Sequence, residues 1–233
     1  MTTLLYPLIT KKIRLSDHIE KYHFNIGIMV ISVWLIKANG KYYLVDTGMG
    51  SMAVYIAKRV LKWQKIEAVF LTHGHSDHIG GVKALKALDP AVNFHIDPYE
   101  YPYISGREPY PRRSRAEKRV FNPAEFISLK SEESKKVQKA AGIEAIFTPG
   151  HSPGHHCFYH KEDKIIIAGD LYTTNRKGVL QPPMERYSAD MNQALISGAQ
   201  VLEQHQDALL SVCHGTEVKK PFLALDRSTW HRK

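Results

Sequence analysis

Cysteine is scarce in this sequence, which has only Cys157 and Cys213 among its 233 residues. Although these two could in principle pair, one pair does not make the disulfide framework on which small secreted proteins depend. A chain of this length can instead bury a hydrophobic core without disulfide support. We therefore expect two buried, inert thiols in a protein of the reducing cytoplasm.

Long apolar runs are also absent. The longest, at residues 26–36, is too short to span a bilayer. The N-terminal run at residues 4–9 is interrupted by Pro7 and lacks the basic start and small-residue cleavage site of a secretory signal. The sequence therefore predicts a soluble protein with no membrane partner and no export signal.

No flexible linker divides the chain, and no internal repeat is visible. With 43% hydrophobic and 24% charged residues, the composition is that of an ordinary globular protein. We therefore predict a single domain over residues 1–233. The net charge of +9 favours anionic partners, although a generic basic surface explains it as well.

Strand, loop and helix signals alternate along most of the chain. A hairpin is expected at residues 28–38 and 41–45, because Asn39-Gly40 between these strand-like runs is a type I′ turn signal. Ser51 is a candidate N-cap for a helix that runs to about residue 63. The further expected elements are strands at residues 66–71, 92–96, 145–148, 156–160, 164–168 and 208–213, and helices at residues 80–88 and 189–204.

Residues 97–125 interrupt this alternation with five prolines and five tyrosines or phenylalanines. The same segment carries a basic set: Arg107, Arg112, Arg113, Arg115, Lys118 and Arg119. A long irregular insertion in a compact domain is often a binding loop or a lid, and a mobile surface loop is the alternative.

The most informative segment is the heptapeptide THGHSDH at residues 72–78. Its imidazoles and carboxylate are the ligands that borderline divalent cations such as zinc accept, and crowded histidines without a metal would be costly to desolvate. An apolar strand is expected to end where the histidines begin, so they should lie on a loop at its C-terminal end. The segment therefore predicts a hydrolytic metal site with four candidate ligands: His73, His75, Asp77 and His78.

Three more candidate ligands, His151, Asp170 and His214, also follow apolar runs. A glycine stands beside each of them and lets the backbone approach a metal closely. Any one of them alone could be an ordinary surface or core side chain. Together with the histidine segment they predict one site assembled from distant parts of the chain.

These motifs resemble those of the metallo-β-lactamase superfamily of metal-dependent hydrolases, from the Asp46-Thr47-Gly48 loop to His214. The resemblance implies an α/β fold of the αββα type, a sandwich of two mixed β-sheets flanked by helices. It also implies two divalent metal ions, zinc with manganese or iron as alternatives. The implied ligands are His73, His75 and His151 for the first metal, Asp77, His78 and His214 for the second, and Asp170 bridging both.

Two metals roughly 3.5 to 4 Å apart can hold a hydroxide between them, polarise the substrate oxygen and stabilise the leaving group. Water is then the nucleophile, and no serine or cysteine nucleophile is needed. Asp77 is the candidate catalytic residue because its carboxylate could also orient the hydroxide. Either a protonated carboxyl group or a metal-bound water could protonate the leaving group.

Four neighbouring residues have weaker signals. Asp46 resembles the carboxylate that orients a ligand histidine in this superfamily, and a plain turn aspartate is the alternative. His155 and His156 begin a strand and are expected to pack or to hydrogen-bond beside the ligands. Ser152 fits the G-x-S-x-G esterase pattern, but a turn and a strand follow it where a nucleophile elbow requires a helix.

The resemblance also narrows the substrate. Zinc β-lactamases of the superfamily lack an aspartate at the position of Asp170, so antibiotic hydrolysis is not expected. Thioesterases like glyoxalase II and N-acyl-homoserine lactonases share the full ligand set, which favours cleavage of an ester, lactone or thioester in a small molecule, with an anionic molecule as one option. Lactonases carry a substrate-contacting tyrosine after the bridging aspartate, but Tyr172 stands closer than in that pattern, and simple packing is the alternative.

Two other functions stay open. The first is phosphodiester cleavage, because the basic, tyrosine-rich insertion could hold phosphates or stack bases. A nucleic-acid partner is not expected, since the chain has no room for the extra domain of the larger nucleases. The second is a non-hydrolytic iron enzyme or a metal-bound scaffold. The full set of seven ligands argues against this second alternative, because it favours two metals and hydrolysis.

Overall fold

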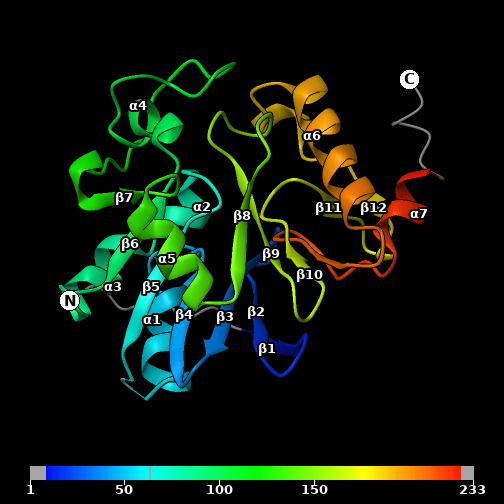
Figure 1. The fold of residues 1–233 in the computed structure, drawn as a ribbon. Helices are drawn as coiled ribbons and strands as arrows, with labels where there is room; N and C mark the ends of the chain where they lie inside the picture. Colours follow the sequence, from blue (N-terminus) through cyan, green and yellow to red (C-terminus); the bar gives the residue numbers. More distant parts are fainter. Residues whose placement is uncertain (1–8, 63, 227–233) are drawn as a thin grey trace.

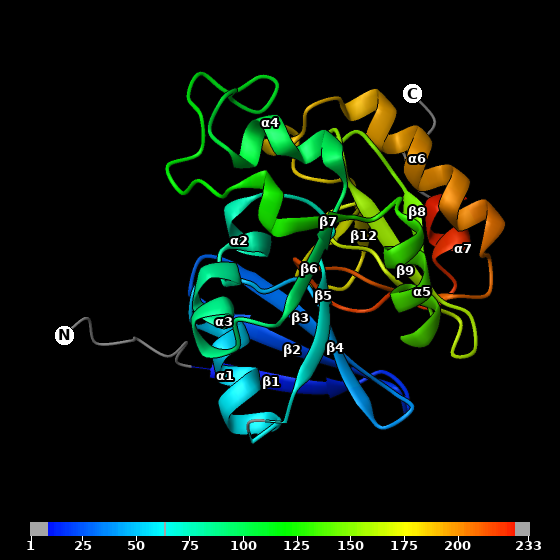
Figure 2. The ribbon, with the colours of Figure 1, turned by 60° about the vertical axis from the view of Figure 1, so that its left-hand side comes forward.

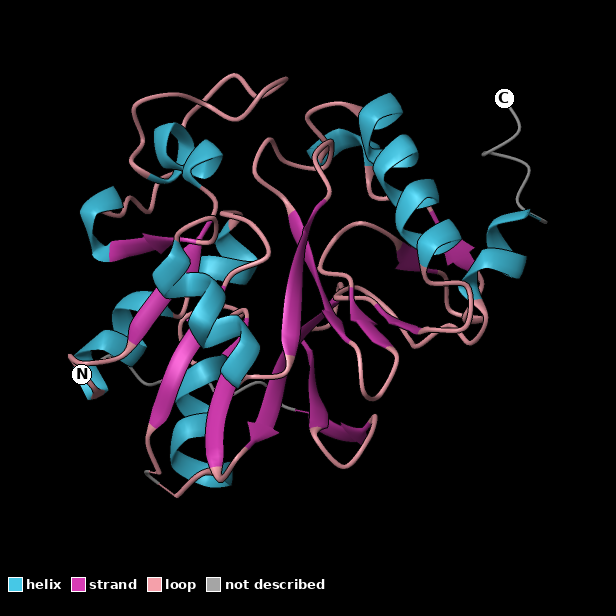
Figure 3. Ribbon diagram, in the orientation of Figure 1, coloured by secondary structure: helices cyan, strands magenta, loops and turns pink. Residues whose placement is uncertain are grey.

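The computed structural model describes residues 9–62 and 64–226. Two β-sheets lie at the centre of the molecule, and helices lie on the outside (Figures 1 and 3). The predicted αββα arrangement of two mixed sheets flanked by helices is confirmed. No helix in the described part of the chain is long and apolar enough to cross a membrane.

The first sheet has seven strands in the order of the sequence. The first four are antiparallel neighbours, and β4 to β7 run parallel to one another. The strands are β1 (Ile9–Arg14), β2 (Ile19–Asn25), β3 (Val30–Ala38), β4 (Lys41–Val45), β5 (Ile66–Phe70), β6 (Asn93–Ile96) and β7 (Phe126–Ser128).

The second sheet has four strands in the order β13-β10-β9-β8. Only the β10–β13 pair is parallel. Its strands are β8 (Ile143–Phe147), β9 (His156–His160), β10 (Ile165–Ile167) and β13 (Leu209–Ser211), and a small separate ribbon contains β11 (Thr173–Thr174) and β12 (Leu180–Gln181).

Helices cover the outer faces of both sheets. In Figure 2, α1 (Met52–Tyr55) and α3 (Val82–Leu88) lie outside the first sheet, while α6 (Met191–Gln204) and α7 (Pro221–Asp226) lie outside the second. The remaining helical segments are η1 (Ile56–Val60), α2 (Ser76–Ile79), η2 (Pro98–Glu100), α4 (Tyr101–Ile104), η3 (Pro123–Glu125), α5 (Glu132–Ala140) and η4 (Glu185–Tyr187).

The core lies where the two sheets face each other. The rings of Phe70 in β5 and Phe158 in β9 are 5.7 Å apart. Trp34 in β3 is fully buried and donates from its indole N–H to Ser211 Oγ in β13 over 2.8 Å. An indole must find such a partner when it is buried, so this bond also fixes how the sheets meet.

The predicted β3–β4 hairpin is confirmed, with Asn39 and Gly40 at φ angles of 51° and 72° as a type I′ turn requires. The expected cap by Ser51 is wrong, because its side chain makes no capping hydrogen bond. The amide groups of Met52 and Ala53 donate instead to carbonyls of the preceding loop. The helix continues from α1 into the wider turn of η1, and its expected end at residue 63 lies outside the described residues.

Strands β1 and β2 and helix α5 were not predicted. Strand β2 does not show an apolar pattern because it buries Glu20 and Lys21, whose charges are compensated by lysines of the neighbouring strands and by Glu217. Helix α5 is mostly polar and gains its stability by packing against β8, which a local pattern does not reveal.

The insertion at residues 97–125 is more ordered than its sequence predicts. It begins with η2 and α4 and ends with η3. Five of its side chains are buried: Asp97, Glu100, Ile104, Tyr110 and Phe121. The segment therefore packs onto the domain and contributes to the environment of the histidine segment.

Candidate metal centre

Four loops that follow strands of both sheets bring the seven candidate ligands together. Residues 72–78 follow β5, and His151 follows β8 in the first loop of the second sheet. Asp170 follows β10 and His214 follows β13. Gly150, at φ +131°, allows the His151 loop to approach α6, since a Cβ there would lie 2.1 Å from the backbone nitrogen of Ala194.

The first group consists of His73, His75 and His151, which point their ring nitrogens at one another. His73 Nε2 lies 2.9 Å and His151 Nε2 3.0 Å from His75 Nδ1. All three rings are buried. These are the three residues that the resemblance to the metallo-β-lactamase superfamily assigns to the first metal.

The second group contains Asp77, His78, Asp170 and His214. His214 Nε2 lies 3.1 Å from Asp77 Oδ2 and 3.3 Å from Asp170 Oδ2. His78 Nε2 lies 3.3 Å from Asp170 Oδ1 and 3.7 Å from Asp77 Oδ2. All four side chains therefore enclose one small space.

Asp170 lies between the two groups. Its Oδ2 is 3.4 Å from His151 Nε2 of the first group, while both of its oxygens face histidines of the second group. One carboxylate is thus in reach of both clusters, and the resemblance assigns a bridging role to this residue.

The two groups fit divalent cations. Ligand nitrogens of a tetrahedral zinc site are roughly 3.3 Å apart, close to the spacing within the first group. His78 Nε2, Asp170 Oδ1 and His214 Nε2 are buried and have no hydrogen-bond partner among the described residues. Such orphaned atoms are costly unless an ion or water satisfies them. The donor set of imidazole nitrogens and carboxylate oxygens is the one that zinc, manganese and iron accept.

Hydrogen bonds on the far side of the rings fix their orientation. Asp46 Oδ2 accepts from His78 Nδ1 over 2.7 Å, and Asp46 also accepts from the backbone and hydroxyl of Thr72. His214 Nδ1 donates to the carbonyl of Val30 over 2.6 Å. Each bond favours the tautomer with its proton on the nitrogen that faces away from the cluster, so that Nε2 would offer its lone pair to a bound metal.

The other candidates have supporting positions. His155 is buried, and its Nε2 accepts from the Asp170 amide over 3.2 Å. His156 donates to the carbonyl of Gly154 and does not face the cluster. Ser152 is also fully buried and donates its hydroxyl to Glu100, so it is not exposed as an esterase nucleophile would be.

Glu100 is a central residue that the sequence did not single out. Its fully buried carboxylate accepts from Gly74 N, Gly154 N, Ser152 Oγ and Tyr110 Oη over 2.6 to 2.9 Å. It therefore joins the histidine segment, the loop that carries His151 and the insertion. A Cβ at position 74 would lie 2.4 Å from the Tyr110 hydroxyl, so only glycine fits there. Nothing in the sequence distinguishes Glu100 from the other three glutamates of the insertion, so no local signal pointed to this role.

Electrostatics differ between the two groups. Burial lowers the pKa of His73 and His75 well below the usual value and that of His151 to about 4, so these rings are neutral near pH 7. Burial also lowers the pKa of His78, but nearby negative charges outweigh it and raise that pKa well above the usual value. Burial raises the pKa of Asp170, but the neighbouring histidine charges hold it well below its normal range.

A cavity of about 280 Å³ opens onto both groups. Four of its lining residues are candidate ligands: His75, Asp77, Asp170 and His214. Apart from Ser76 and Arg113, the others are apolar or aromatic: Ile26, Ile28, Met29, Ile31, Met49, Met184 and Tyr187. The cavity thus joins a polar site to an apolar wall.

Tyr172 does not line this cavity. It is fully buried in an apolar cluster with Ile166 of β10 and Val201 of α6, where a Cβ on Gly198 of α6 would lie 2.3 Å from its hydroxyl. The structure therefore places Tyr172 as a packing residue, which was the alternative to a lactonase-like contact with substrate.

Arg113 comes from the insertion and lies over the site. Its Nη2 is 2.9 Å from His75 Nε2, and its guanidinium stacks on the rings of Tyr110 and Tyr187 at 5.1 and 5.7 Å. It also pairs with Glu117. The sequence predicted a basic insertion without identifying which of its arginines reaches the histidines.

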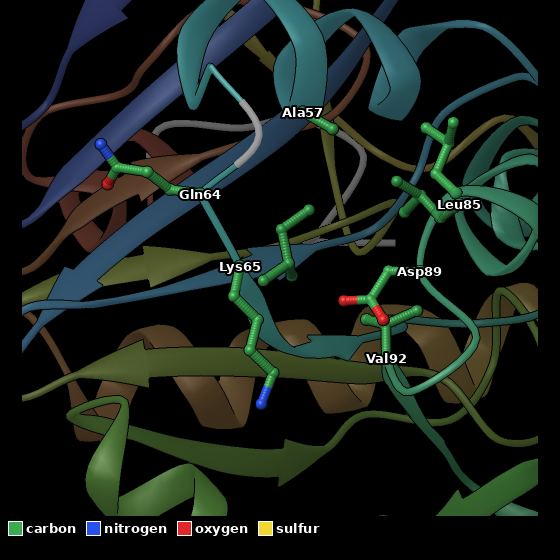
Figure 4. Close-up of a pocket in the computed structure, with 8 residues that line it drawn as sticks. Ala57, Gln64, Lys65, Leu85, Asp89 and Val92 are labelled. Carbon is green, nitrogen blue, oxygen red and sulfur yellow. The ribbon is translucent and has the colours of Figure 1, made fainter.

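Another hollow, of about 320 Å³, is shown in Figure 4. Its lining includes Ala57, Gln64 and Lys65 before β5 and Leu85 in α3. It lies at the start of β5, whereas residues 72–78 follow the end of this five-residue strand, roughly 16 Å away. None of the seven candidate ligands, all within the described residues, lines it.

Comparisons with known proteins agree with this geometry. A sequence profile of the metallo-β-lactamase superfamily matches residues 26–212. A probable metallo-hydrolase, YybB of Bacillus subtilis strain 168, is 34% identical over 209 residues, which cover 88% of this chain and 91% of that protein. An atrochrysone carboxyl ACP thioesterase of Aspergillus fumigatus is 27% identical over 152 residues, covering 60% of this chain and 39% of the fungal protein.

A solved structure has the same fold. The crystal structure of TTHA1623 in a di-iron-bound form matches with a TM-score of 0.65 and 20% identity, over 87% of this chain and 96% of that one. The profile match spans well over half of the chain, and the Bacillus relative matches almost end to end. The chain therefore belongs to the metallo-β-lactamase superfamily of metal-dependent hydrolases.

Proposed function

We propose that the protein is a dinuclear-metal hydrolase that cleaves an ester, a lactone or a thioester of a small molecule. The observation that carries the proposal is the position of Asp170, whose carboxylate lies within 3.4 Å of histidine nitrogens from both groups. A mononuclear site would have no use for a second, separate set of unsatisfied buried ligands. The fungal relative named as a thioesterase supports the substrate class.

Two divalent cations there, zinc by expectation and manganese or iron as alternatives, would supply a bridging hydroxide as nucleophile and polarise the scissile carbonyl. The protein's own contribution is a rigid, largely buried ligand set. Asp46 and the Val30 carbonyl hold His78 and His214 in place, so little reorganisation is needed when the ions bind.

Asp77 is the proposed catalytic residue besides being a ligand. Its side chain lines the cavity and is 23% exposed, against 5% for Asp170. It is therefore the carboxylate most accessible to water and substrate. We assign it the task of orienting the attacking water, accepting its proton and delivering this proton to the leaving oxygen or sulfur.

The cavity supports an acyl substrate of moderate size. Its apolar wall, which includes Ile28, Met29 and Met49, suits a hydrocarbon portion. Arg113 supplies a positive charge beside His75, so an anionic group on the substrate would be favoured. The proposal thus combines an apolar acyl group with a negative charge elsewhere in the molecule.

The test begins with metal content. Protein loaded with zinc, manganese or iron should hold two ions per chain by elemental analysis, and Asp170→Asn should hold fewer. The loaded enzyme is then assayed on aryl esters, N-acyl-homoserine lactones and acyl thioesters. His75→Ala should lose at least about 100-fold in kcat/KM, in line with losing a metal ligand.

His205→Ala is the matched control, because His205 lies at the end of α6 and stacks on Tyr159 away from the candidate ligands. It should keep both metals and full activity. The proposal would be contradicted if the loaded wild-type protein held only one ion per chain. It would also be contradicted if His75→Ala hydrolysed the substrates as fast as the wild type does.

Phosphodiester cleavage is the second candidate function. The basic side chains of residues 112–119 favour it, since phosphates bind arginine and lysine well. Including bis(p-nitrophenyl) phosphate in the same panel decides between the two. Higher kcat/KM on this phosphodiester than on every carboxylic ester and thioester would make it the main activity.

We also propose a cytoplasmic location. Both cysteines are buried, free thiols, as expected for a protein of a reducing compartment. Burial raises the pKa of Cys157 to about 12, which keeps this thiol protonated and unreactive. Immunodetection in fractionated cells of the source organism tests the location, and recovery outside the cytoplasmic fraction would contradict it.

A further inference from the structure

A further hollow lies on the side of the insertion, beside the cavity of about 280 Å³ that opens onto the candidate ligands, which we call the reaction cavity. The further hollow has a volume of about 510 Å³, and four cationic side chains line it: Arg113, Arg115, Lys118 and Arg119. We call it the basic pocket. Its single lining carboxylate is Glu117.

Most of this positive charge is uncompensated. Glu117 pairs with Arg113, and no other carboxylate among the described residues forms an ion pair with Arg115, Lys118 or Arg119. Arg119 donates only to a backbone carbonyl, that of Gly80. Three cations around one hollow repel one another, and an anion between them would relieve this repulsion.

The basic pocket adjoins the reaction cavity. Met49, Ser76 and Arg113 line both hollows. Arg113 is therefore the boundary residue, with its guanidinium held between the rings of Tyr110 and Tyr187. A ligand whose reacting bond lies at Asp77 could extend past Arg113 into the basic pocket.

Arg113 itself has unused hydrogen-bonding capacity. Its Nε is buried and has no acceptor among the described residues. Its Nη2 faces His75 Nε2, which must carry a proton whenever His75 binds a metal through Nδ1. Two donors of Arg113 then lack a protein acceptor, which is the arrangement that suits a doubly charged oxyanion.

We propose that the basic pocket binds a phosphate group carried by the alcohol or thiol half of the substrate. The inference rests on the proposed esterase or thioesterase function and names its substrate class: acyl compounds with a phosphorylated leaving group. The apolar wall of the reaction cavity takes the acyl half, so the phosphorylated half extends to the opposite side. A phosphate, with about two negative charges at neutral pH, matches several cations better than a single carboxylate does.

The experiment measures binding to the metal-loaded protein by calorimetry with two probes, pantetheine and pantetheine 4′-phosphate. Both carry the same thiol, so any contact of sulfur with the metals is common to them and the difference reports the phosphate. Wild type should bind the phosphorylated probe about 10- to 100-fold more tightly at low salt, as expected for charge-assisted hydrogen bonds. The preference should shrink as salt is raised.

The decisive variant is the triple substitution Arg115→Gln, Lys118→Gln and Arg119→Gln. These side chains are exposed, so folding should be preserved, and thermal unfolding checks this. The phosphate preference should fall to less than about threefold. Arg107→Gln, an exposed arginine of the same insertion that does not line the basic pocket, should keep the wild-type preference.

Three results would overturn the inference. One is equal affinity of wild type for the two probes. Another is a triple variant that still prefers the phosphorylated probe as strongly as wild type does. The third is a preference for the phosphorylated probe that is lost only in His75→Ala, because the phosphate would then bind the metals. These readouts are independent of turnover, so absence of ester and thioester hydrolysis would contradict the proposed function separately.

Discussion

At the scale of single residues, Glu100 fixes the positions of two ligand-bearing loops with one carboxylate. Its oxygens accept from Gly74 beside the histidines and from Gly154 beyond His151. Burial raises the pKa of Glu100, and the hydrogen bonds that it accepts oppose this shift. Such a carboxylate is stable only because every surrounding group is a donor.

We therefore expect Glu100→Gln to be destabilising although it preserves shape. The amide NH₂ of glutamine would face backbone and hydroxyl donors, which leaves several buried groups unsatisfied and costs about 2–4 kcal/mol. Urea unfolding measures the loss, and competition with a chelator should show weaker metal binding because both loops loosen. Glu108→Gln, an exposed substitution in the same insertion, is the control. Unchanged unfolding of Glu100→Gln would contradict this role.

At the scale of elements, strand β2 connects the first sheet to the loop that carries His214. Lys21 in β2 is fully buried and donates from Nζ to the carbonyls of Val212 and Gly215 and to Glu217 Oε1 over 2.8 to 2.9 Å. Burial lowers the pKa of Lys21, and the charge of Glu217 opposes this shift. One lysine thus fixes the backbone on both sides of His214.

Replacing Lys21 by methionine keeps the apolar stem and removes the three donors. We expect a loss of about 3 kcal/mol, because Glu217 would be left as a partly buried, unpaired charge. The double variant with Glu217→Gln should recover part of this loss in chemical denaturation. Lys11→Met, at an exposed position on the neighbouring strand, is the control. An equal loss in the single and double variants would show that Glu217 is not the partner that matters.

Glu20, also in β2, couples three strands and gives a pH dependence. Burial raises its pKa, but hydrogen bonds from Lys12 in β1, Lys37 in β3 and Tyr22 outweigh this and lower it to about 2. A carboxyl group whose pKa is lower in the folded state stabilises the protein at any pH above its unfolded-state pKa of 4.5. This stabilisation is lost as the pH falls toward the folded-state pKa of about 2.

Wild type should therefore exceed Glu20→Gln in stability by about 1–2 kcal/mol at pH 7, allowing for solvent screening of the lysines. This gap should narrow steadily between pH 4.5 and 2. Urea titrations of both proteins across this range measure it, with Glu144→Gln, an exposed position on β8, as the control. A gap that stays constant with pH would rule out the ion pairs as its cause.

At the scale of the whole molecule, local signals predicted many of the strands and the loops on which the candidate ligands lie: apolar runs end in His, Asp and Gly, and Asn39-Gly40 has the dihedral angles of its turn. The two-sheet architecture was implied by the resemblance to the metallo-β-lactamase superfamily and not by these local signals. What the local signals missed depends on contacts distant in the sequence. Lys21 and Glu217 are 196 positions apart, and Glu100 meets Ser152 across 52. No local pattern reveals such partners.

The site also joins the two halves of the fold, which predicts how metal removal acts on the whole protein. The candidate ligands come from loops of both sheets, so each bound ion would stabilise the folded state only, by about 4 kcal/mol at a metal concentration 1,000 times Kd. For a domain of this size the melting temperature should fall by roughly 8–16 °C for each ion that a chelator removes. Differential scanning calorimetry with and without chelator measures the shift, and readdition of zinc should reverse it. If His75→Ala has lost its metals, its melting temperature should be the same with and without chelator. If the chelator lowers the melting temperature of His75→Ala as much as that of wild type, the ions stabilise the protein from another site.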